Sequence, residues 1–190
     1  AGTCMDSGKT AAACAIVSRL RHRGLHVAAC KATGVSLRRD ILAMQDAGAA
    51  ETTIFSDLGI VTTTAENGPA LTRTLLTNLA AEKPDVIVLE LGDGLLGAYG
   101  VEAILSDASI RDALTAVALC ANDPVAAWGG AKILREQFGI EPAVVTGPAT
   151  DNAVGIDQIS ERLDLPAINA LSNGVALGDH IASVLEGERK

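Results

Sequence analysis

The chain begins with Ala1-Gly2-Thr3-Cys4-Met5-Asp6-Ser7-Gly8-Lys9-Thr10, which ends in Gly-Lys-Thr and runs directly into an Ala-rich stretch with helical spacing. Gly-Lys-Thr before a helix is typical of a phosphate-binding loop. In such a loop, backbone N–H groups cradle polyphosphate, the lysine pairs with the outer phosphates and the threonine hydroxyl contacts Mg²⁺. The residues expected to bind the phosphates of a nucleotide are Thr3, Cys4, Met5, Asp6, Ser7, Gly8, Lys9 and Thr10.

A phosphate-binding loop normally follows a β-strand and precedes a helix. Only Ala1 and Gly2 stand before Thr3, which occupies the place of the first glycine in the general G-x-x-x-x-G-K-[ST] pattern. We therefore expect residues 1–190 to form a single domain that belongs to a longer chain, whose sheet has one more central strand.

Composition favours an α/β protein and argues against nucleic acid as a partner. Hydrophobic residues make up 48% of the chain and aromatic residues only 2%, so the core is built from Ala, Val, Leu and Ile, as in sheets covered by helices on both faces. The net charge is −8, and the 15 basic residues do not cluster, which disfavours a phosphate backbone as ligand. No apolar run reaches the roughly 20 residues that span a bilayer, so no membrane contact is expected.

The four cysteines and three histidines do not indicate a metal centre. The cysteines lack C-x-x-C spacing, and no histidine stands at ligand spacing from one of them. Cysteines in or beside apolar stretches behave as small hydrophobes, which fits a reducing, cytoplasmic location.

Apolar strand-like stretches alternate with helical ones along the chain. We expect helices over 10–23, 36–47, 66–82, 124–138, 152–163 and 175–185, and strands over 25–30, 85–90, 114–120, 142–146 and, more weakly, 166–170. Such alternation predicts right-handed βαβ crossovers and a doubly wound, mostly parallel sheet with helices on both faces. Residues 53–64 fit neither pattern.

Four polar or glycine-rich turns follow expected strands, and the carboxyl ends of parallel strands meet at one sheet edge, where ligands bind. Besides the phosphate loop, these turns are 31–34, 90–94 and 146–148. Lys31 ends a buried strand at this edge and is expected to neutralise phosphate or a substrate carboxylate. Glu90 also ends an apolar strand and needs a partner, for which a metal ion is the better candidate than a lysine. Spacing alone gives Asp40 no role.

The same residues resemble the dethiobiotin synthetases. The loop resembles their Gly-Thr-x-x-x-x-Gly-Lys-Thr, Lys31 to Gly34 their Lys-Pro-x-x-x-Gly strand end, Leu37 to Gln45 their Asp-containing helix, and Glu90 to Gly94 their Glu-Gly-x-Gly-Gly turn. The last turn is also similar to that of cobyrinic acid amidating synthases. The chain further resembles the P-loop domain of the domain-of-unknown-function 1611 group, which is linked to D-amino-acid N-acylation.

The first resemblance implies a P-loop NTPase fold, bound Mg-ATP and activation of a carboxylate through a phosphorylated intermediate. Carried over by position, Lys9 and Lys31 are catalytic and stabilise the transferred phosphate, while Thr10, Asp40 and Glu90 bind Mg²⁺. The synthetases read adenine with Asn-Arg after a late strand, where this chain has Thr146-Gly147. ATP is favoured over GTP by the absence of an Asn-Lys-x-Asp pattern.

Three functions remain open from the sequence. The first is a Mg-ATP-dependent enzyme that activates a small carboxylate or carbamate by phosphoryl transfer. The second is a nucleotide-binding regulatory module of a larger protein, and the third is an N-acyltransferase domain that holds the phosphates of coenzyme A. The expected partners are a small substrate with a carboxylate or an amine and, at most, a second copy of the chain as a homodimer.

Overall fold

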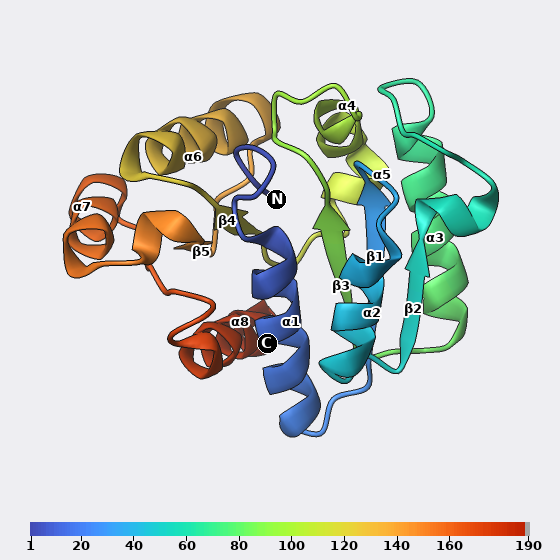
Figure 1. Ribbon diagram of the computed structural model, residues 1–190, viewed down its shortest axis with the longest axis horizontal. Coiled ribbons are helices and arrows are strands. Elements are labelled where there is room, and N and C mark those ends of the chain that lie inside the picture. The colour runs from blue at the N-terminus through green and yellow to red at the C-terminus, as the bar shows by residue number, and fades with distance from the viewer. Residues whose placement is uncertain (189–190) are drawn as a thin grey trace.

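Parallel β-strands form the middle layer of the computed structural model, which describes residues 1–188 (Figure 1). Strands β1 (Val27–Thr33), β2 (Glu51–Ile54) and β3 (Val86–Leu91) form one sheet in the order β2-β1-β3. Strands β4 (Ala118–Cys120) and β5 (Val144–Thr146) form a second. All three ladders are parallel. The expected α/β class and parallel sheet are confirmed.

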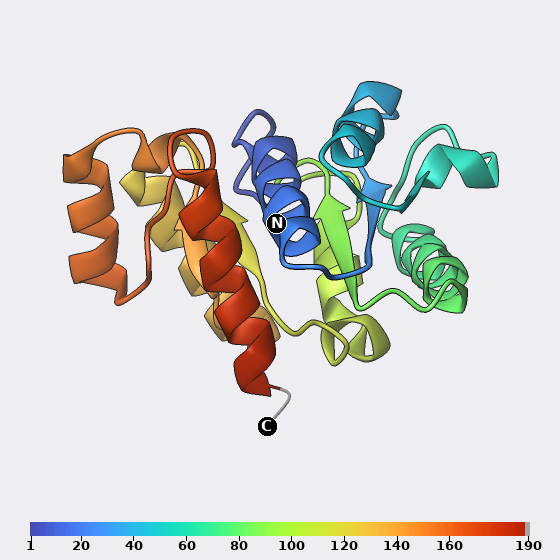
Figure 2. The same ribbon diagram turned by 90° about the horizontal axis from the view of Figure 1, so that it is seen from below.

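Helices cover both faces of these strands. Helices α1 (Lys9–His22), α2 (Arg38–Asp46) and α8 (Gly174–Glu188) pack into one apolar cluster, together with side chains from β1, β4 and β5. A second cluster holds the other face, where the helices are α3 (Gly68–Ala81), α4 (Val101–Ser106), α5 (Ala108–Arg111), α6 (Pro124–Phe138) and α7 (Ala153–Leu163). Figure 2 shows α1 and α2 on one side of the strands and α3 on the other. The chain is therefore a three-layer α/β fold.

Local signals in the sequence set the ends of the best-predicted helices. Asp123 caps α6 by accepting a hydrogen bond from the Ala126 N–H at 2.8 Å, Pro124 occupies the first turn, and Gly139 ends the helix with φ of 67°. Asn152 caps α7 in the same way through the Gly155 N–H. These caps satisfy backbone groups that a helix end leaves unpaired, so the helix bounds follow closely from the sequence.

Other expected elements are shorter in the structure. The strand expected over 114–120 is paired only at Ala118–Cys120, and the weak strand over 166–170 is reduced to a single bridge between Val145 and Ala167. The unassigned segment 53–64 contains the end of β2 and a 3₁₀ turn, η1 (Phe55–Leu58), and returns to pair Thr62 with Val35. A second 3₁₀ turn, η2 (Pro148–Thr150), follows β5. The short helices α4 and α5 have too few turns to give a periodic signal.

Among residues 1–188, β3 pairs only with β1 and β4 only with β5, so the strand layer is interrupted between β3 and β4. The first residues of the chain lie at one end of this interruption, where Gly2 forms a parallel bridge with Cys120. Within the same described range, no helix combines the length and the apolar character needed to cross a membrane.

Candidate nucleotide and magnesium site

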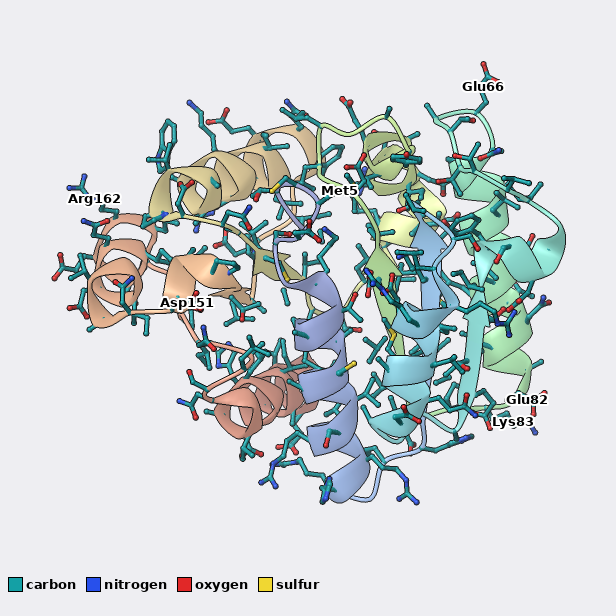
Figure 3. All side chains as sticks on the ribbon, viewed as in Figure 1. Met5, Glu66, Glu82, Lys83, Asp151 and Arg162 are labelled. Carbon is teal, nitrogen blue, oxygen red and sulfur yellow. The ribbon has the colours of Figure 1, made fainter. Side chains whose placement is uncertain are left out.

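The loop 2–8 leads from the bridge at Cys120 to the first turn of α1. The Thr3 N–H donates to the Cys120 carbonyl at 2.9 Å, and the Leu95 N–H donates to the Gly2 carbonyl at 2.9 Å. Gly8 then turns the chain into the helix with φ of 87°, a conformation that glycine adopts without strain. Met5 lies at the outer part of the loop with its side chain largely in solvent (Figure 3). The loop is thus fixed at both ends and places the N-terminus of a 14-residue helix beside it, a geometry that favours anions.

The side chain of Lys9 folds back across this loop. Its Nζ donates to the Cys4 carbonyl at 2.6 Å and to Ser7 Oγ at 3.3 Å. Ser7 is fully buried and donates its own hydroxyl proton to the same carbonyl at 2.9 Å. The ammonium group therefore lies within the loop, where a phosphate oxygen could take over as its acceptor.

Glycine-rich turns from both sheets pack against the loop backbone. A Cβ atom on Gly94, in the turn after β3, would lie 2.4 Å from the Thr3 carbonyl oxygen. A Cβ atom on Gly147, after β5, would lie 2.3 Å from the Ser7 carbonyl oxygen, and Gly147 has φ of 92°. The turn after β1 joins them, because Thr33 Oγ1 donates to the Gly92 carbonyl at 2.8 Å. The four turns that the sequence predicts at one sheet edge do meet there.

Glu90 comes from the end of β3 and faces the first turn of α1. Thr10 Oγ1 donates to Glu90 Oε1 at 3.3 Å, and the glutamate side chain is only 4% exposed. Its second oxygen, Oε2, is buried without a hydrogen-bond partner among the described residues. Burial raises the pKa of Glu90, while the charge of Lys31 and the hydrogen bond from Thr10 act in the opposite direction. This buried oxygen is free to contact a cation, a water molecule or a donor group of a ligand.

Lys31 lies between two acidic side chains. Its Nζ donates to Asp40 Oδ2 from α2, and it lies 3.8 Å from Glu90 Oε1. The lysine side chain is 6% exposed and that of Asp40 13%. Two carboxylates and one ammonium group leave a formal charge of −1 in a poorly hydrated place, so the group can accept further positive charge.

Thr10, Asp40 and Glu90 fit Mg²⁺ better than they fit a metal ion that is held by protein ligands alone. Within residues 1–188, no group of three or more His, Cys, Asp or Glu side chains could hold a metal ion. Mg²⁺ needs only one or two carboxylates, because phosphate oxygens and water complete its shell. The structure brings the predicted ligands Thr10 and Glu90 into contact and places Asp40 beside them through Lys31. Their ligand roles, and the catalytic roles of Lys9 and Lys31, stay predictions.

Two residues at the site were missed from the sequence. Asn122 follows β4, and its Nδ2 donates to Cys4 Sγ at 3.2 Å. The sequence marks Asn122 in the same way as Lys31, because each is a polar residue just after an apolar strand. Thr63 lies in the unassigned segment, accepts a hydrogen bond from the Gly34 N–H at 3.3 Å and donates to the Tyr99 carbonyl at 2.9 Å. No periodic pattern marks it, because it belongs to an irregular segment.

No known family model and no curated protein matches this chain. Solved structures with a similar fold include chloroplast FtsY from Physcomitrella patens, with 15% sequence identity and a TM-score of 0.64 over 97% of this chain and 63% of that one. The signal recognition particle receptor FtsY from Elizabethkingia anophelis shares 14% identity, with a TM-score of 0.63 over 94% and 62%. Cell division protein FtsY from Thermotoga maritima shares 16%, with a TM-score of 0.60 over 97% and 66%.

At such low identities the likeness concerns the fold alone. The chain shares its fold with these FtsY structures, and it spans about 62–66% of their length.

Proposed function

We propose that this chain binds a magnesium nucleotide, ATP by preference, and activates a small carboxylate or carbamate by transfer of the terminal phosphoryl group. The proposal rests above all on Glu90, whose buried Oε2 lacks a partner although Oε1 contacts Thr10 and lies near Lys31. A loop that only held phosphate would have no need of this carboxylate.

Phosphoryl transfer requires positioning and charge neutralisation more than covalent chemistry by the protein. Lys9 and the loop N–H groups would hold the β and γ phosphates, and Thr10, Glu90 and Asp40 would hold Mg²⁺. When bound, Mg²⁺ neutralises charge on the phosphate oxygens.

Lys31 is suited to the acceptor side of the reaction. Its ammonium group is anchored by Asp40 and lies 3.8 Å from Glu90. From there it can neutralise the substrate carboxylate or the phosphoryl group in transit. Because Lys31 is almost fully buried, its charge acts in a medium of low dielectric constant, where such an interaction is stronger than in water.

A nucleotide-binding module without turnover is the second candidate, since one structure of the same fold carries the name of a receptor. The buried group Lys31, Asp40 and Glu90 favours an enzyme. Buried charges are costly to retain, and a module needs only Lys9 and Thr10. Turnover that depends on Glu90 separates the two candidates.

Calorimetry with ATP, GTP and acetyl-coenzyme A, each with and without Mg²⁺, tests the proposal. We expect the tightest binding with Mg-ATP, and Lys9→Ala should weaken it by roughly 10–100-fold, as loss of a charged hydrogen bond does. Lys132→Ala is the matched control, because Lys132 is an exposed lysine on α6 whose partners are Glu136 and Trp128.

The same panel can overturn the proposal. Nucleotide binding that is unchanged in Lys9→Ala would refute the phosphate-loop assignment. Tighter binding of GTP would correct the base, and binding of acetyl-coenzyme A without any effect of Mg²⁺ would favour the acyltransferase. Glu90→Gln should abolish the effect of Mg²⁺ on affinity, and an unchanged effect would remove Glu90 from the metal site.

A further inference from the structure

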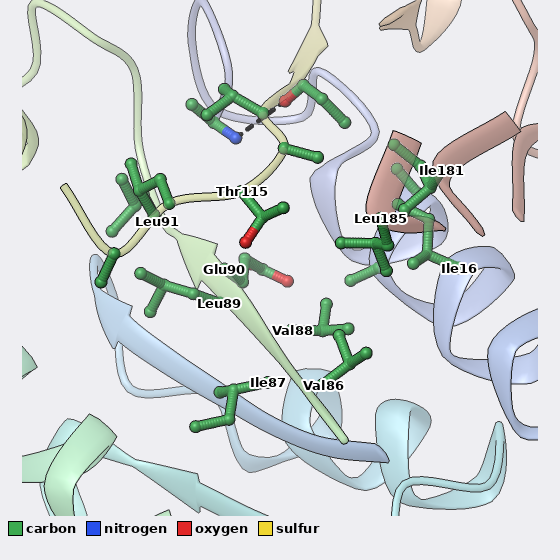
Figure 4. Close-up of a pocket in the computed structure, with 18 of the residues that line it drawn as sticks. Ile16, Val86, Ile87, Val88, Leu89, Glu90, Leu91, Thr115, Ile181 and Leu185 are labelled. Atoms are coloured by element: carbon green, nitrogen blue, oxygen red, sulfur yellow. Dashed lines mark hydrogen bonds between the residues drawn. The ribbon is translucent and has the colours of Figure 1, made fainter. Parts of the chain in front are cut away.

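Two hollows of the molecule differ in their chemistry. The larger, of about 620 Å³, lies in the interruption beside β3, and Figure 4 shows Ile181 and Leu185 on the side of β3 to which Val88 points. This hollow adjoins Lys9 and Glu90 and so belongs to the site already described. The smaller, of about 570 Å³, is a groove between α6 and α7, and its lining shares no residue with that site.

The α6–α7 groove is formed by the first turns of α6 and the last turns of α7. Its lining residues are Pro124, Val125, Trp128, Gln158, Arg162 and Leu163. Val125 and Trp128 stand three positions apart on one face of α6, and they are 77% and 53% exposed. Trp128 is also the only tryptophan of the chain. Large apolar side chains that gather in a concave part of the surface are typical of interaction sites.

The charge of the groove is positive, although the whole chain carries a net charge of −8. Arg162 is the one charged side chain in the lining, and its guanidinium forms no hydrogen bond or ion pair with any residue of the range 1–188. Figure 3 shows Arg162 at the outer edge of α7. Lys132 adds a second cation, since its Nζ lies 5.3 Å from the centroid of the Trp128 ring. The exposed carboxylates of Asp157 and Glu161 on α7 stay outside the lining.

The walls of the groove favour a helix as its occupant. Both walls are helices, whose backbone N–H and C=O groups bond within the helix and offer no edge to an extended segment. A partner must therefore satisfy its own backbone hydrogen bonds and contact the groove through side chains, as an amphipathic helix does. The unpaired guanidinium of Arg162 calls for a carboxylate on that helix.

We propose that the α6–α7 groove binds an acidic amphipathic helix of a partner protein. Large apolar side chains at positions i, i+3 or i+4, and i+7 of that helix pack against Val125 and Trp128. A Glu or Asp beside them pairs with Arg162. Because the groove shares no residue with the nucleotide site, this inference does not depend on the proposed function, and either can fail without the other.

A synthetic peptide tests the proposal without any nucleotide. The peptide consists of two copies of Glu-Leu-Ala-Glu-Leu-Leu-Ala, which place leucines on one helical face and glutamates beside them. Its matched control carries Gln in place of every Glu. Trp128 reports binding, because its indole leaves water when the groove is filled. The acidic peptide should shift the Trp128 emission to shorter wavelength in a saturable way, and the Gln peptide should bind about fivefold more weakly.

Three outcomes of this titration would overturn the proposal. The first is the absence of a saturable shift with the acidic peptide, and the second is equal affinity for the two peptides. The third is a Trp128 emission that shifts with protein concentration alone, since the groove would then be the contact surface of a second copy of the chain.

Trp128→Ala and Arg162→Gln locate the bound peptide. Both side chains are exposed, so each substitution should move the thermal midpoint by less than about 2 °C. Fluorescence anisotropy of the labelled acidic peptide should show binding that is about tenfold weaker in Trp128→Ala and about fivefold weaker in Arg162→Gln. Arg21→Gln is the matched control, because Arg21 is an exposed arginine of α1 outside the groove. Unchanged binding in Trp128→Ala and Arg162→Gln would place the peptide elsewhere and refute the proposal.

Gln158 gives a second test with opposite signs. Gln158→Glu places a carboxylate four positions before Arg162, where it pairs with the guanidinium and supports the helix. It should weaken binding of the acidic peptide about fivefold without lowering the thermal midpoint, whereas Gln158→Lys should strengthen binding about threefold. Ser160→Glu is the control, since Ser160 is exposed on α7 outside the groove, and it should leave the affinity unchanged. The proposal is wrong if both Gln158 substitutions change the affinity in the same direction.

Discussion

The two parts of the strand layer contribute different chemistry to the same loop. The part built from β2, β1 and β3 brings ionisable side chains, with Lys31 and Glu90 at its strand ends and Asp40 on the following helix. The part built from β4 and β5 contacts the loop through the amide of Asn122 and the backbone of Gly147, which are neutral. If the proposed function is right, we expect phosphate and metal chemistry to depend on the ionisable side chains of the first part, and the second part to act on the loop only through neutral contacts.

The two parts also differ in how far their strands extend. β1 has seven residues and a neighbour on each side, whereas β4 has three residues and one strand neighbour. Strand length here follows the pairing that is present, because an apolar segment becomes a strand only where its backbone groups find partners.

The largest effect concerns whether the two parts unfold together. The chain has two phenylalanines, Phe55 beside β2 and Phe138 at the end of α6, and both are buried in one apolar cluster. Phe55→Ala and Phe138→Ala should each cost about 3–5 kcal/mol of unfolding free energy, as removal of a buried phenyl ring does. Because the cluster is shared, each variant should still unfold in one transition by circular dichroism and by tryptophan fluorescence. Separate transitions for the two probes would show that the interruption uncouples the parts.

A smaller effect is expected at the glycines through which each part contacts the loop. Gly94→Ala places a methyl group against the Thr3 carbonyl, and Gly147→Ala places one against the Ser7 carbonyl at a positive φ. Each should cost about 1–3 kcal/mol and weaken nucleotide binding, since the loop must move. Gly129→Ala is the control, because nothing lies within 4 Å of its added Cβ in α6 and alanine favours helix. If Gly94→Ala and Gly147→Ala bind nucleotide normally, the contacts do not shape the loop.

The division of chemistry can be tested with one residue from each part. Lys31→Met should lower phosphoryl transfer by about 10–100-fold with little change in nucleotide affinity, because it removes a charge and leaves the loop intact. Asn122→Ala should change turnover by less than about threefold, since it removes one hydrogen bond to Cys4. Steady-state kinetics with saturating Mg-ATP measures both. A larger loss of turnover in Asn122→Ala than in Lys31→Met would contradict the assignment of charge chemistry to the first part.

The sequence predicts the charged side chains of the site better than the lengths of the strands, for physical reasons. Lys9 and Thr10 follow from the loop motif, and Glu90 from an apolar strand that ends in a carboxylate. Asp40 followed only from a family resemblance, because its pairing with Lys31 depends on how α2 packs beside β1. The strand expected over 114–120 was too long, since apolar character marks burial and does not show whether a neighbouring strand is present. Asn122 has the same sequence signal as Lys31, a polar residue directly after an apolar strand, whereas Thr63 acts through tertiary contacts that no local pattern encodes.

The smallest effect is expected from an ion pair between helix α1 and helix α8, which pack together against strands of both parts. Asp179 of α8 accepts hydrogen bonds from Arg19 at 2.7 Å and Arg23 at 3.1 Å, both of α1. The hydrogen bond from Arg19, followed by that from Arg23, lowers the pKa of Asp179 below its ordinary value. A carboxylate with a lowered pKa stabilises the fold above the ordinary aspartate range, near pH 4, and this stabilisation is lost as the pH falls through the lowered pKa.

Asp179→Asn should therefore lower the urea midpoint slightly at pH 7, and the difference from the parent chain should vanish near pH 2. The effect is small because the side chains are about one-third exposed, and it should shrink further in 1 M salt. Glu136→Gln is the control, since it breaks a surface pair with Lys132 inside α6 alone. If the ion pair of Asp179 helps to hold the two parts together, Asp179→Asn should lower the urea midpoint at pH 7 more than Glu136→Gln does. Equal shifts would mean that packing of α1 against α8, and not their ion pair, joins the two parts.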